Sequence, residues 1–397
     1  MTSDFDAVVA GHICLDVHPD LSGSEREPFE KIFVPGRLIE AGPVTYSTGG
    51  AVSNTGLALD RLGIATKLVG KVGDDLFGQT LCEIITSYGE NLTEGITIDS
   101  SVGTSYTVII NYPGKDRIFL HYPGANDIFD ARDVPFGFLE RARLFHFGYP
   151  PLMRSTFLND GVQLEMILRQ AHKMGVTTSL DMAFPDPTSE AAHADWRSIL
   201  KSVLPHVDIF MPSVEEILFM IRRQTYEEMC ATNAGPNILP LIPPELLSDI
   251  AQELIEMGAR IVGLKLGYRG LYLRTGNPLL IKSMGRACPS NPDAWASKEL
   301  WVPCFKIVVA GTTGSGDATI AGFLAALLRG LSIEESLRLA VAVGACNAEA
   351  VDALSGIRSW ETTRARVAAA WEQQTFDLVC PGWKLDEANG LWRGPAT

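Results

Sequence analysis

Residues 311–317 read Gly-Thr-Thr-Gly-Ser-Gly-Asp, and the fold can be worked out from this stretch. The β-branched apolar run 307–309 precedes it, and the small and apolar segment 318–329 follows it as far as Gly330, a suitable helix C-cap. This order predicts a buried strand, a glycine-rich turn and a helix. Backbone N–H groups at the start of a helix are unpaired and carry the positive end of its dipole, so the turn can bind an anion.

Asp317 closes the turn, and three interpretations of it compete. The carboxylate could simply complement the helix dipole. A dinucleotide-binding motif would need a third glycine where Thr319 stands, and a Walker A loop would need a lysine, which is absent. The third interpretation is phosphoryl transfer, in which backbone amides hold the transferred phosphate and Asp317 takes the proton of the acceptor.

The composition limits the function classes that need to be considered. The chain has 397 residues, of which 46% are hydrophobic and 20% charged, and its net charge is -14. This charge argues against partners that need a basic surface, such as nucleic acid or an anionic membrane. An anionic substrate would therefore need a local cradle of amides and metal.

Targeting signals and cysteines point to one compartment. The sequence has no apolar run of about 18 residues and no basic-then-apolar N-terminus, so we expect neither a transmembrane helix nor a signal peptide. The seven cysteines are scattered and form no C-x-x-C pair. Reduced thiols and a cytoplasmic location are the prediction.

Most of the chain alternates short apolar strands with helices, which is typical of a three-layer α/β fold with a mostly parallel sheet. The predicted strands are 6–11, 65–70, 143–148, 177–181, 207–211, 261–267 and 270–273. Ligands of such sheets bind outside the carboxyl ends of the strands. His146 lies inside one of these apolar runs and is expected to be a core histidine.

Several segments depart from this alternation. Residues 104–110 and 117–120 flank Pro113-Gly114 and predict an antiparallel hairpin, which could serve as a lid or a dimer surface. Arg117 in this hairpin is expected to be a solvated charge. The stretches 222–244 and 276–302 look inserted, a last helix is expected over 360–373, and the tail from 376 onward is expected to lie draped on the surface.

Two motifs away from the turn carry polar groups. Gly49-Gly50 leads into a helix of small residues in which Asn54 must either tie down a loop or meet a polar ligand. Ser213-x-x-Glu216 is a capping box that starts another helix.

Together, the segment 311–317 with Ala321-Gly322 and the motif Gly49-Gly50-x-x-x-Asn54 resemble the two signatures of the ribokinase-like (pfkB) carbohydrate kinases. The resemblance extends from about Val8 to Gly356. It implies a ribokinase-like domain over residues 1–375 with a small β lid built from about 12–48 and 100–122, followed by a tail over 376–397.

The resemblance also implies ATP-dependent phosphorylation of a hydroxyl on a sugar or a similar small molecule, with Asp317 as general base. It implies an anion hole made by the amides of Gly314, Ser315 and Gly316. The implied acceptor-binding residues are Asp16, Gly49, Gly50 and Asn54. The implied nucleotide-binding residues are Lys265, Gly267, Thr312, Thr313 and Asn347, with Glu216 linked to Mg²⁺.

Two positions differ from the family pattern. Gly311 replaces an aspartate that commonly helps to hold a monovalent cation, so activation by K⁺ is left open. Ser213 replaces the asparagine of the family's Asn-x-x-Glu motif. Two roles of Glu216 are therefore left open, one in capping the helix and one in binding Mg²⁺. The alternatives to a sugar kinase are a nucleoside kinase of the same fold and a kinase-fold binding or regulatory protein without turnover.

Overall fold

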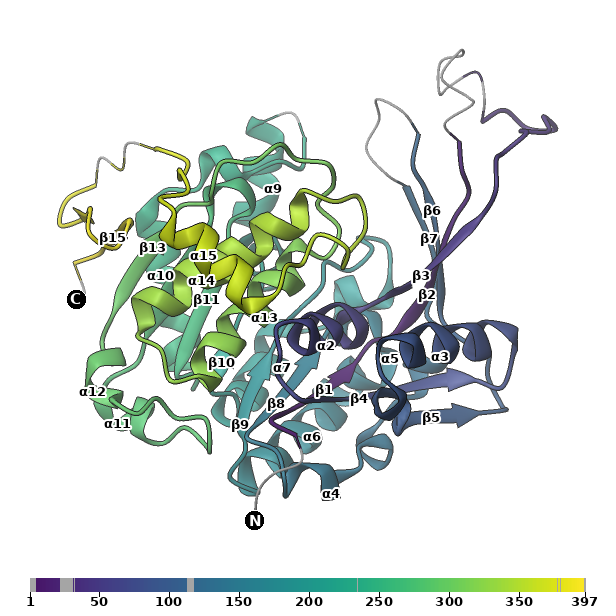
Figure 1. The fold of residues 1–397 in the computed structure, drawn as a ribbon, viewed down its shortest axis with the longest axis horizontal. Helices are drawn as coiled ribbons and strands as arrows, with labels where there is room; N and C mark the ends of the chain where they lie inside the picture. Colours follow the sequence, from purple (N-terminus) through teal and green to yellow (C-terminus); the bar gives the residue numbers. More distant parts are fainter. Residues whose placement is uncertain are drawn as a thin grey trace.

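The computed structural model describes residues 5–21, 31, 33–112, 118–233, 235–376, 378 and 380–395. Their strands form one 11-stranded sheet and one small sheet of four strands (Figure 1). The small sheet has the order β3-β2-β6-β7 and contains β2 (Cys14–His18), β3 (Thr45–Gly49), β6 (Tyr106–Ile110) and β7 (Ile118–Tyr122).

The large sheet has the strand order β14-β15-β13-β12-β11-β10-β9-β8-β1-β4-β5. All neighbours from β11 to β5 are parallel, and all neighbours from β11 to β14 are antiparallel. The strands are β1 (Ala7–Gly11), β4 (Thr66–Gly73), β5 (Gly95–Asp99), β8 (Leu144–Gly148), β9 (Thr177–Leu180), β10 (Ile209–Phe210), β11 (Ile261–Lys265), β12 (Leu271–Thr275), β13 (Glu299–Val302), β14 (Lys384–Asp386) and β15 (Leu391–Arg393).

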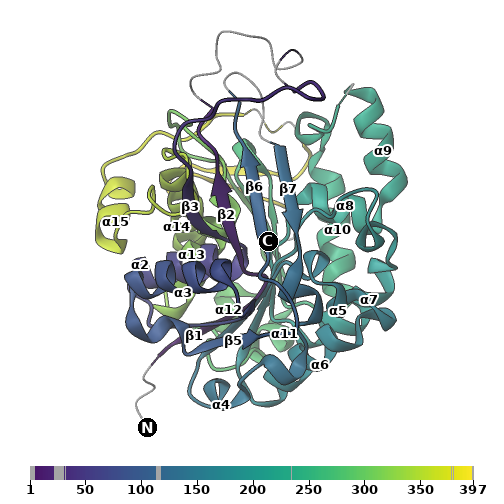
Figure 2. The ribbon, with the colours of Figure 1, turned by 90° about the vertical axis from the view of Figure 1, so that its right-hand side faces the viewer.

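Helices cover both faces of this sheet, which confirms the three-layer prediction. Figure 2 shows α2, α3, α13 and α14 on one side and α6, α7, α8 and α10 on the other. The helices are α2 (Ala51–Arg61), α3 (Leu76–Tyr88), α4 (Phe136–Leu139), α5 (Arg154–Phe157), α6 (Val162–Lys173), α7 (Trp196–Val203), α8 (Val214–Ile221), α9 (Arg223–Thr232), α10 (Pro244–Glu256), α11 (Pro278–Lys282), α12 (Pro292–Trp295), α13 (Ser315–Leu328), α14 (Ile333–Ala348) and α15 (Trp360–Ala368).

The strands in the middle of the sheet separate two hydrophobic cores. In β1, Ala7 and Val9 face one core, whereas Val8 and Ala10 face the other. Because side chains alternate along a strand, a strand buried on both faces is a continuous apolar run, as β1 is. Among the described residues, no helix combines the length and the apolar character that crossing a bilayer requires.

The small sheet projects from the body (Figure 1). Its β6 and β7 pair antiparallel, as predicted, and β2 lies parallel to β6. The predicted turn Pro113-Gly114 and Arg117 lie outside the described residues. The small β lid expected from the sequence is therefore present, although it also includes one parallel pairing.

The prediction of a strand over 307–309 is wrong. Val308 and Val309 are 87% and 60% exposed, and no strand forms there. The backbone of this segment bonds elsewhere: Lys306 N–H donates to the Glu372 carbonyl and Ala310 N–H to the Ala348 carbonyl. An irregular loop, and not a strand, therefore leads into the glycine-rich turn.

Expectations for the C-terminal half also need correction. The stretches that look inserted contain regular elements, namely β13, a buried strand inside the sheet, in 276–302 and α9 in 222–244. Their inserted character stays a prediction. The tail is not merely draped on the surface, because β15 pairs with β13 and β14 pairs with β15. Without the tail, β13 would be an edge strand with unpaired backbone N–H and C=O groups, and β15 supplies hydrogen-bond partners for them.

Candidate active site

The glycine-rich turn leads into α13, a helix that starts at Ser315, as the sequence predicted. Gly314 is the N-cap residue, with a left-handed φ of 70°, and it has no side-chain capping bond within the described part of the chain. The first-turn amides of a helix without a side-chain cap can bind an anion, although the Ser315 N–H also makes a 3.3 Å hydrogen bond to the Thr312 carbonyl. Ser315, Gly316 and Asp317 all lie in this turn, and Asp317 is only 2% exposed.

Three neutral donors hold the Asp317 carboxylate. Oδ2 accepts from the Tyr149 hydroxyl at 2.7 Å and from Asn54 Nδ2 at 3.1 Å. Oδ1 accepts from the Thr55 hydroxyl at 3.2 Å. Asn54 and Thr55 come from the N-terminal half of α2, so this helix is tied to α13 at the site. Asn54 therefore binds within the protein, while its buried Oδ1 has no partner among the described atoms.

Tyr149 was not identified from the sequence. It follows β8 with a left-handed φ of 66°, which is unusual for a residue with a side chain. Burial, followed by the charge of Asp317, raises the pKa of Tyr149 well above its usual value. The phenol therefore stays protonated and keeps donating to Asp317. The unusual backbone at the carboxyl end of a strand is typical of a functional position, but no pattern in the sequence marked it.

Close backbone packing explains why position 311 is a glycine. A Cβ built on it would lie 2.8 Å from the Val351 carbonyl oxygen and 2.9 Å from that of Ala350. A residue with a side chain at this position would push the two segments apart. The loop that leads into α13 is thus packed against residues 350–351 in a way that only glycine allows without a shift.

A buried cation lies beside the same helix terminus. Lys265 Nζ is 2.7 Å from Asp181 Oδ1, at the ends of β11 and β9, and 3.5 Å from the position that a Cβ of Gly316 would take. Burial acts to lower the pKa of Lys265, but attraction to Asp181, Glu216 and Asp317 raises it. The ammonium is therefore charged and close to the predicted anion hole.

The two carboxylates near Lys265, those of Asp181 and Glu216, differ in their hydrogen-bond partners. Burial raises the pKa of Asp181, against the attraction of Lys265. Its Oδ2 has no hydrogen-bond partner in the described part of the structure. Glu216 Oε2 accepts from the Ser213 backbone N–H at 2.7 Å, and Ser213 Oγ accepts from the Glu216 N–H, so the predicted capping box is present.

The other predicted nucleotide residues lie around the loop and the end of α14. Asn347 Nδ2 donates to the Thr313 carbonyl at 2.8 Å, and its buried Oδ1 has no partner among the atoms described. The Thr312 carbonyl accepts from the Ser315 hydroxyl at 3.0 Å. Gly267 starts a short turn after β11, with a φ of 51°.

Asp16 lies on β2, opposite the glycine pair. Its carboxylate accepts from the Cys14 thiol at 3.4 Å, and a Cβ on Gly49 would come within 2.5 Å of both its oxygens. Only glycine at position 49 leaves room for this carboxylate. Burial raises the pKa of Asp16 to about 6, although hydrogen bonds from Cys14 and Thr107 oppose this.

Asp16, Gly50 and Asn54 line a cavity of about 900 Å³ together with Gly314. Tyr149 lines it as well, and two histidines that the sequence did not single out, His12 and His121, also contribute. Two of the three donors to Asp317 thus face the same space as Asp16. Three of the four predicted acceptor residues therefore lie around one cavity with Thr313 and Gly314 of the glycine-rich turn, whereas Gly49 is not among the lining residues.

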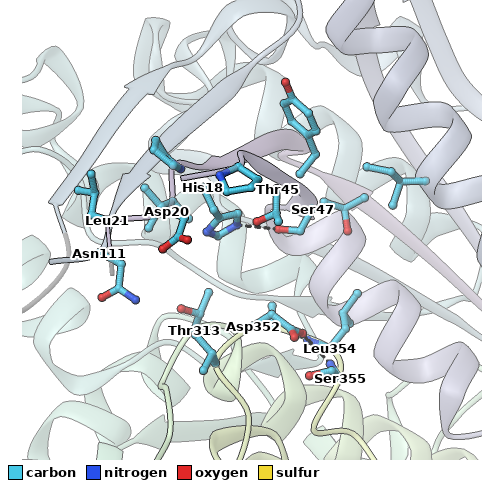
Figure 3. A pocket seen from close by; sticks show the side chains of 18 of the residues that line it. His18, Asp20, Leu21, Thr45, Ser47, Asn111, Thr313, Asp352, Leu354 and Ser355 are labelled. Atoms are coloured by element: carbon cyan, nitrogen blue, oxygen red, sulfur yellow. Dashed lines mark hydrogen bonds between the residues drawn. The ribbon is translucent and has the colours of Figure 1, made fainter. Parts of the chain in front are cut away.

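A second cavity of about 790 Å³ lies next to the first and shares Ile109 and Thr313 with it. Figure 3 shows His18, Asp20 and Ser47 of the lid region across from Thr313 and Asp352 of the body. His18 Nε2 and Ser47 Oγ are 2.9 Å apart. The cleft therefore continues along the small sheet beyond Asp16.

His146 lies in the core, as expected, beside Ser179 at 3.0 Å. Burial, followed by the charge of Lys265, lowers its pKa to about 3, so it is neutral. All seven cysteines belong to the described part and none forms a disulfide. The described residues contain no cluster of three or more His, Cys, Asp or Glu side chains that could hold a metal by themselves.

Comparison with known proteins places this geometry in a family. Fructokinase-2 of Zea mays is 26% identical over 336 residues, which cover 83% of each chain. The ribokinase of Arabidopsis thaliana complexed with ribose and ATP has a TM-score of 0.65 at 19% identity, covering 91% of this chain and 98% of its own. A candidate ribokinase II of E. coli in complex with ATP and Mg²⁺ has a TM-score of 0.65 at 17% identity, covering 92% and 99%.

The family model described as pfkB family carbohydrate kinase matches residues 6–360, nearly the whole described body. With both cavity-lining motifs in place and the ribokinase-like fold shared with the solved structures, the chain belongs to the pfkB family of carbohydrate kinases.

Proposed function

We propose that this kinase transfers the γ-phosphate of ATP to a hydroxyl of a neutral sugar, with Asp317 as general base. The observation that carries the proposal is the placement of one buried carboxylate at the start of α13, beside a cavity that Asp16 lines on its other side. The hydroxyl proton moves to Asp317 as the hydroxyl oxygen bonds to the γ-phosphorus and ADP leaves. Positioning and charge stabilisation supply most of the catalysis in such a reaction.

The amides of Gly314, Ser315 and Gly316 are the proposed anion hole, and Lys265 adds a positive charge beside it. Asn347 and Gly267, together with Thr312 and Thr313, are the proposed nucleotide contacts. ATP is bound in solved structures of similar fold, one of which also contains Mg²⁺.

The residues present fit a magnesium ion that is held mainly by nucleotide phosphates. Mg²⁺ usually keeps several waters and takes only one or two carboxylates from the protein. The unpartnered Oδ2 of Asp181 is one candidate ligand, and Glu216 is the other. When bound, the ion would neutralise charge on the transferred phosphate.

The charges around the cavities favour a neutral acceptor over a sugar phosphate or a sugar acid. Arg61 and Arg154 are the arginines among the described lining residues. Arg61 Nη1 donates to the Leu354 carbonyl at 2.8 Å, and Arg154 pairs with Glu190 at 2.8 Å. Both cations are therefore committed within the protein, and the carboxylate of Asp16, which lines the larger cavity, can accept from hydroxyl groups of a neutral acceptor.

A homodimer formed through the small sheet remains part of the proposal, as does a cytoplasmic location. The apolar side chains of β7 are 40–55% exposed, at Ile118, Phe119, Leu120 and Tyr122. An exposed outer strand with this many apolar groups is a suitable surface for a second copy.

An ADP-release screen tests the function. The purified chain is assayed with Mg-ATP over pentoses, hexoses, sugar acids, sugar phosphates and nucleosides, with and without K⁺. We expect turnover of a neutral pentose or hexose and little of the charged analogues. Turnover of a nucleoside but of no sugar would contradict the sugar kinase and support a nucleoside kinase of the same fold. Sugar binding by calorimetry without ADP release from any acceptor would favour a regulatory protein.

A further inference from the structure

A chain of polar side chains crosses the small sheet next to Asp16. The register pairs Asp16 on β2 with Thr107 on β6, and Thr107 with His121 on β7. Thr107 Oγ1 is 3.7 Å from Cys14 Sγ and 3.0 Å from His121 Nδ1. His121 Nε2 is 3.4 Å from Nε2 of His12, which follows β1 in the body. Asp16, Cys14, Thr107 and His12 are buried, whereas His121 is the exposed member.

The direction of every hydrogen bond in this chain can be derived from its acidic end. Ionised Asp16 can only accept, so the Cys14 thiol donates to it. The Thr107 hydroxyl must then direct its proton toward Cys14 and Asp16, because the thiol proton is already used. Thr107 therefore accepts from His121, whose proton has to be on Nδ1.

The same reasoning continues to His12. A neutral His121 with its proton on Nδ1 has a bare Nε2, so it accepts from Nε2–H of His12. His12 then carries a lone pair on Nδ1. That atom is buried and has no partner among the described residues. Burying a lone pair costs less than burying an unpaired N–H, so the orphan atom agrees with the derived direction.

We propose that His12, His121, Thr107 and Cys14 form one directional hydrogen-bond chain that positions the Asp16 carboxylate for the acceptor's hydroxyl groups. This inference rests on the proposed function, since it concerns the affinity for the acceptor. The four residues are positioning residues, because they act through Asp16. His121 is on the outer strand of the small sheet and His12 is in the body, so the chain also links the lid to the body beside the acceptor cavity.

A double-mutant cycle tests the chain through kinetics. Thr107→Val and His121→Phe each keep the shape of the side chain and remove its hydrogen bonds. We expect each to raise the acceptor KM about tenfold, with kcat and the KM for ATP changed by less than about threefold. The double variant should be no worse than either single variant, because both interrupt the same chain.

The controls and the contrary results are as follows. Thr107→Ser keeps the hydroxyl and should restore the acceptor KM to within about twofold of wild type. Thr97→Val, on β5 away from the cavity, should change nothing. Multiplicative effects in the double variant, or a loss confined to kcat, would overturn the inference.

The tautomers can be read without any turnover, by nitrogen NMR of ¹⁵N-histidine-labelled protein at pH 8. Assignment uses His12→Phe and His121→Phe. We expect His121 as the Nδ1–H form, which is the minor tautomer of free neutral histidine, and His12 as the Nε2–H form. Thr107→Val should release His121 toward Nε2–H. An Nε2–H form of His121 in wild type would refute the chain. If no acceptor is phosphorylated, the proposed function fails, and this measurement still decides the chain.

Discussion

Asp317 and Asp181 are two buried carboxylates of the same site, but they are held in different ways. Asp317 accepts hydrogen bonds from three neutral donors, Tyr149, Asn54 and Thr55. Asp181 pairs with one cation, Lys265, and leaves Oδ2 without a partner among the described residues. Hydrogen bonds from neutral donors and pairing with a cation are two different ways to hold a buried carboxylate. In the proposed function, Asp317 takes the proton, and the pair of Asp181 with Lys265 places charge beside the anion hole.

Asp317→Asn should produce the largest loss of activity. The amide keeps the size of the side chain but cannot take a proton, so we expect kcat to fall about 10²–10⁴-fold. Nucleotide affinity, measured by calorimetry, should change little. Asp60→Asn at the end of α2 is the matched control and should keep wild-type turnover. A variant of Asp317 with kcat within tenfold of wild type would reverse the assignment of the two carboxylates.

Lys265→Met tests the other half of the contrast through stability. Removing the cation leaves Asp181 buried and unpaired, which should lower the free energy of unfolding by about 3–5 kcal/mol. The double variant with Asp181→Leu should recover most of this loss. Lys282→Met, at an exposed ion pair with Asp293, should cost less than about 1 kcal/mol.

The sign of the pH dependence sharpens this test. The pKa of Asp181 is raised in the folded protein, so the folded state binds more protons than the unfolded state above the usual carboxyl pKa. The contribution of Asp181 to stability therefore falls as pH rises. We expect Lys265→Met to lower the free energy of unfolding, relative to wild type, by more at pH 9 than at pH 5. Urea denaturation at the two pH values measures this. An equal loss at both would show that Asp181 does not carry the effect.

The sequence was informative where the signal is local. The alternation of apolar strands and helices predicted the layers, and Ser213-x-x-Glu216 predicted a capping box that the structure contains. The β-branched segment 307–309 led to a wrong strand prediction, because such residues favour strands only where a sheet offers partners. Here the flanking residues Lys306 and Ala310 donate to the carbonyls of Glu372 and Ala348 instead.

The site was predictable in part for the same reason. Asp317 and its glycines are adjacent in the chain, so their pattern is visible. Two of its donors, Thr55 and Tyr149, are 262 and 168 residues away in sequence, and only the folded chain brings α2 and the residue after β8 to the start of α13. The histidine pair, at positions 12 and 121, is likewise a product of the small sheet's register.

Asp16→Asn extends the contrast to a third buried carboxylate. Burial raises the pKa of Asp16 to about 6, so its ionised form destabilises the folded state above that pH. At about 1.4 kcal/mol per pKa unit, the cost is about 3 kcal/mol at pH 8, and it disappears as pH falls toward 4. The variant should therefore unfold at a higher temperature than wild type at pH 8 but not at pH 4, and its acceptor KM should rise about 10–100-fold. A lower melting temperature at pH 8 would contradict the cost assigned to this anion.

Tyr149→Phe probes the neutral donors of Asp317 with the smallest change. The hydroxyl donates to Asp317 Oδ2 at 2.7 Å, and its loss should reduce kcat about tenfold. Without this donor, the Asp317 carboxylate is held by Asn54 and Thr55 alone, and steady-state kinetics with the acceptor found in the ADP-release screen measures the loss. Tyr226→Phe, on α9 and outside the lining of both cavities, serves as the control. A kcat within about twofold of wild type would show that the Tyr149 hydroxyl does not support the base, and the three neutral donors would then no longer distinguish Asp317 from Asp181.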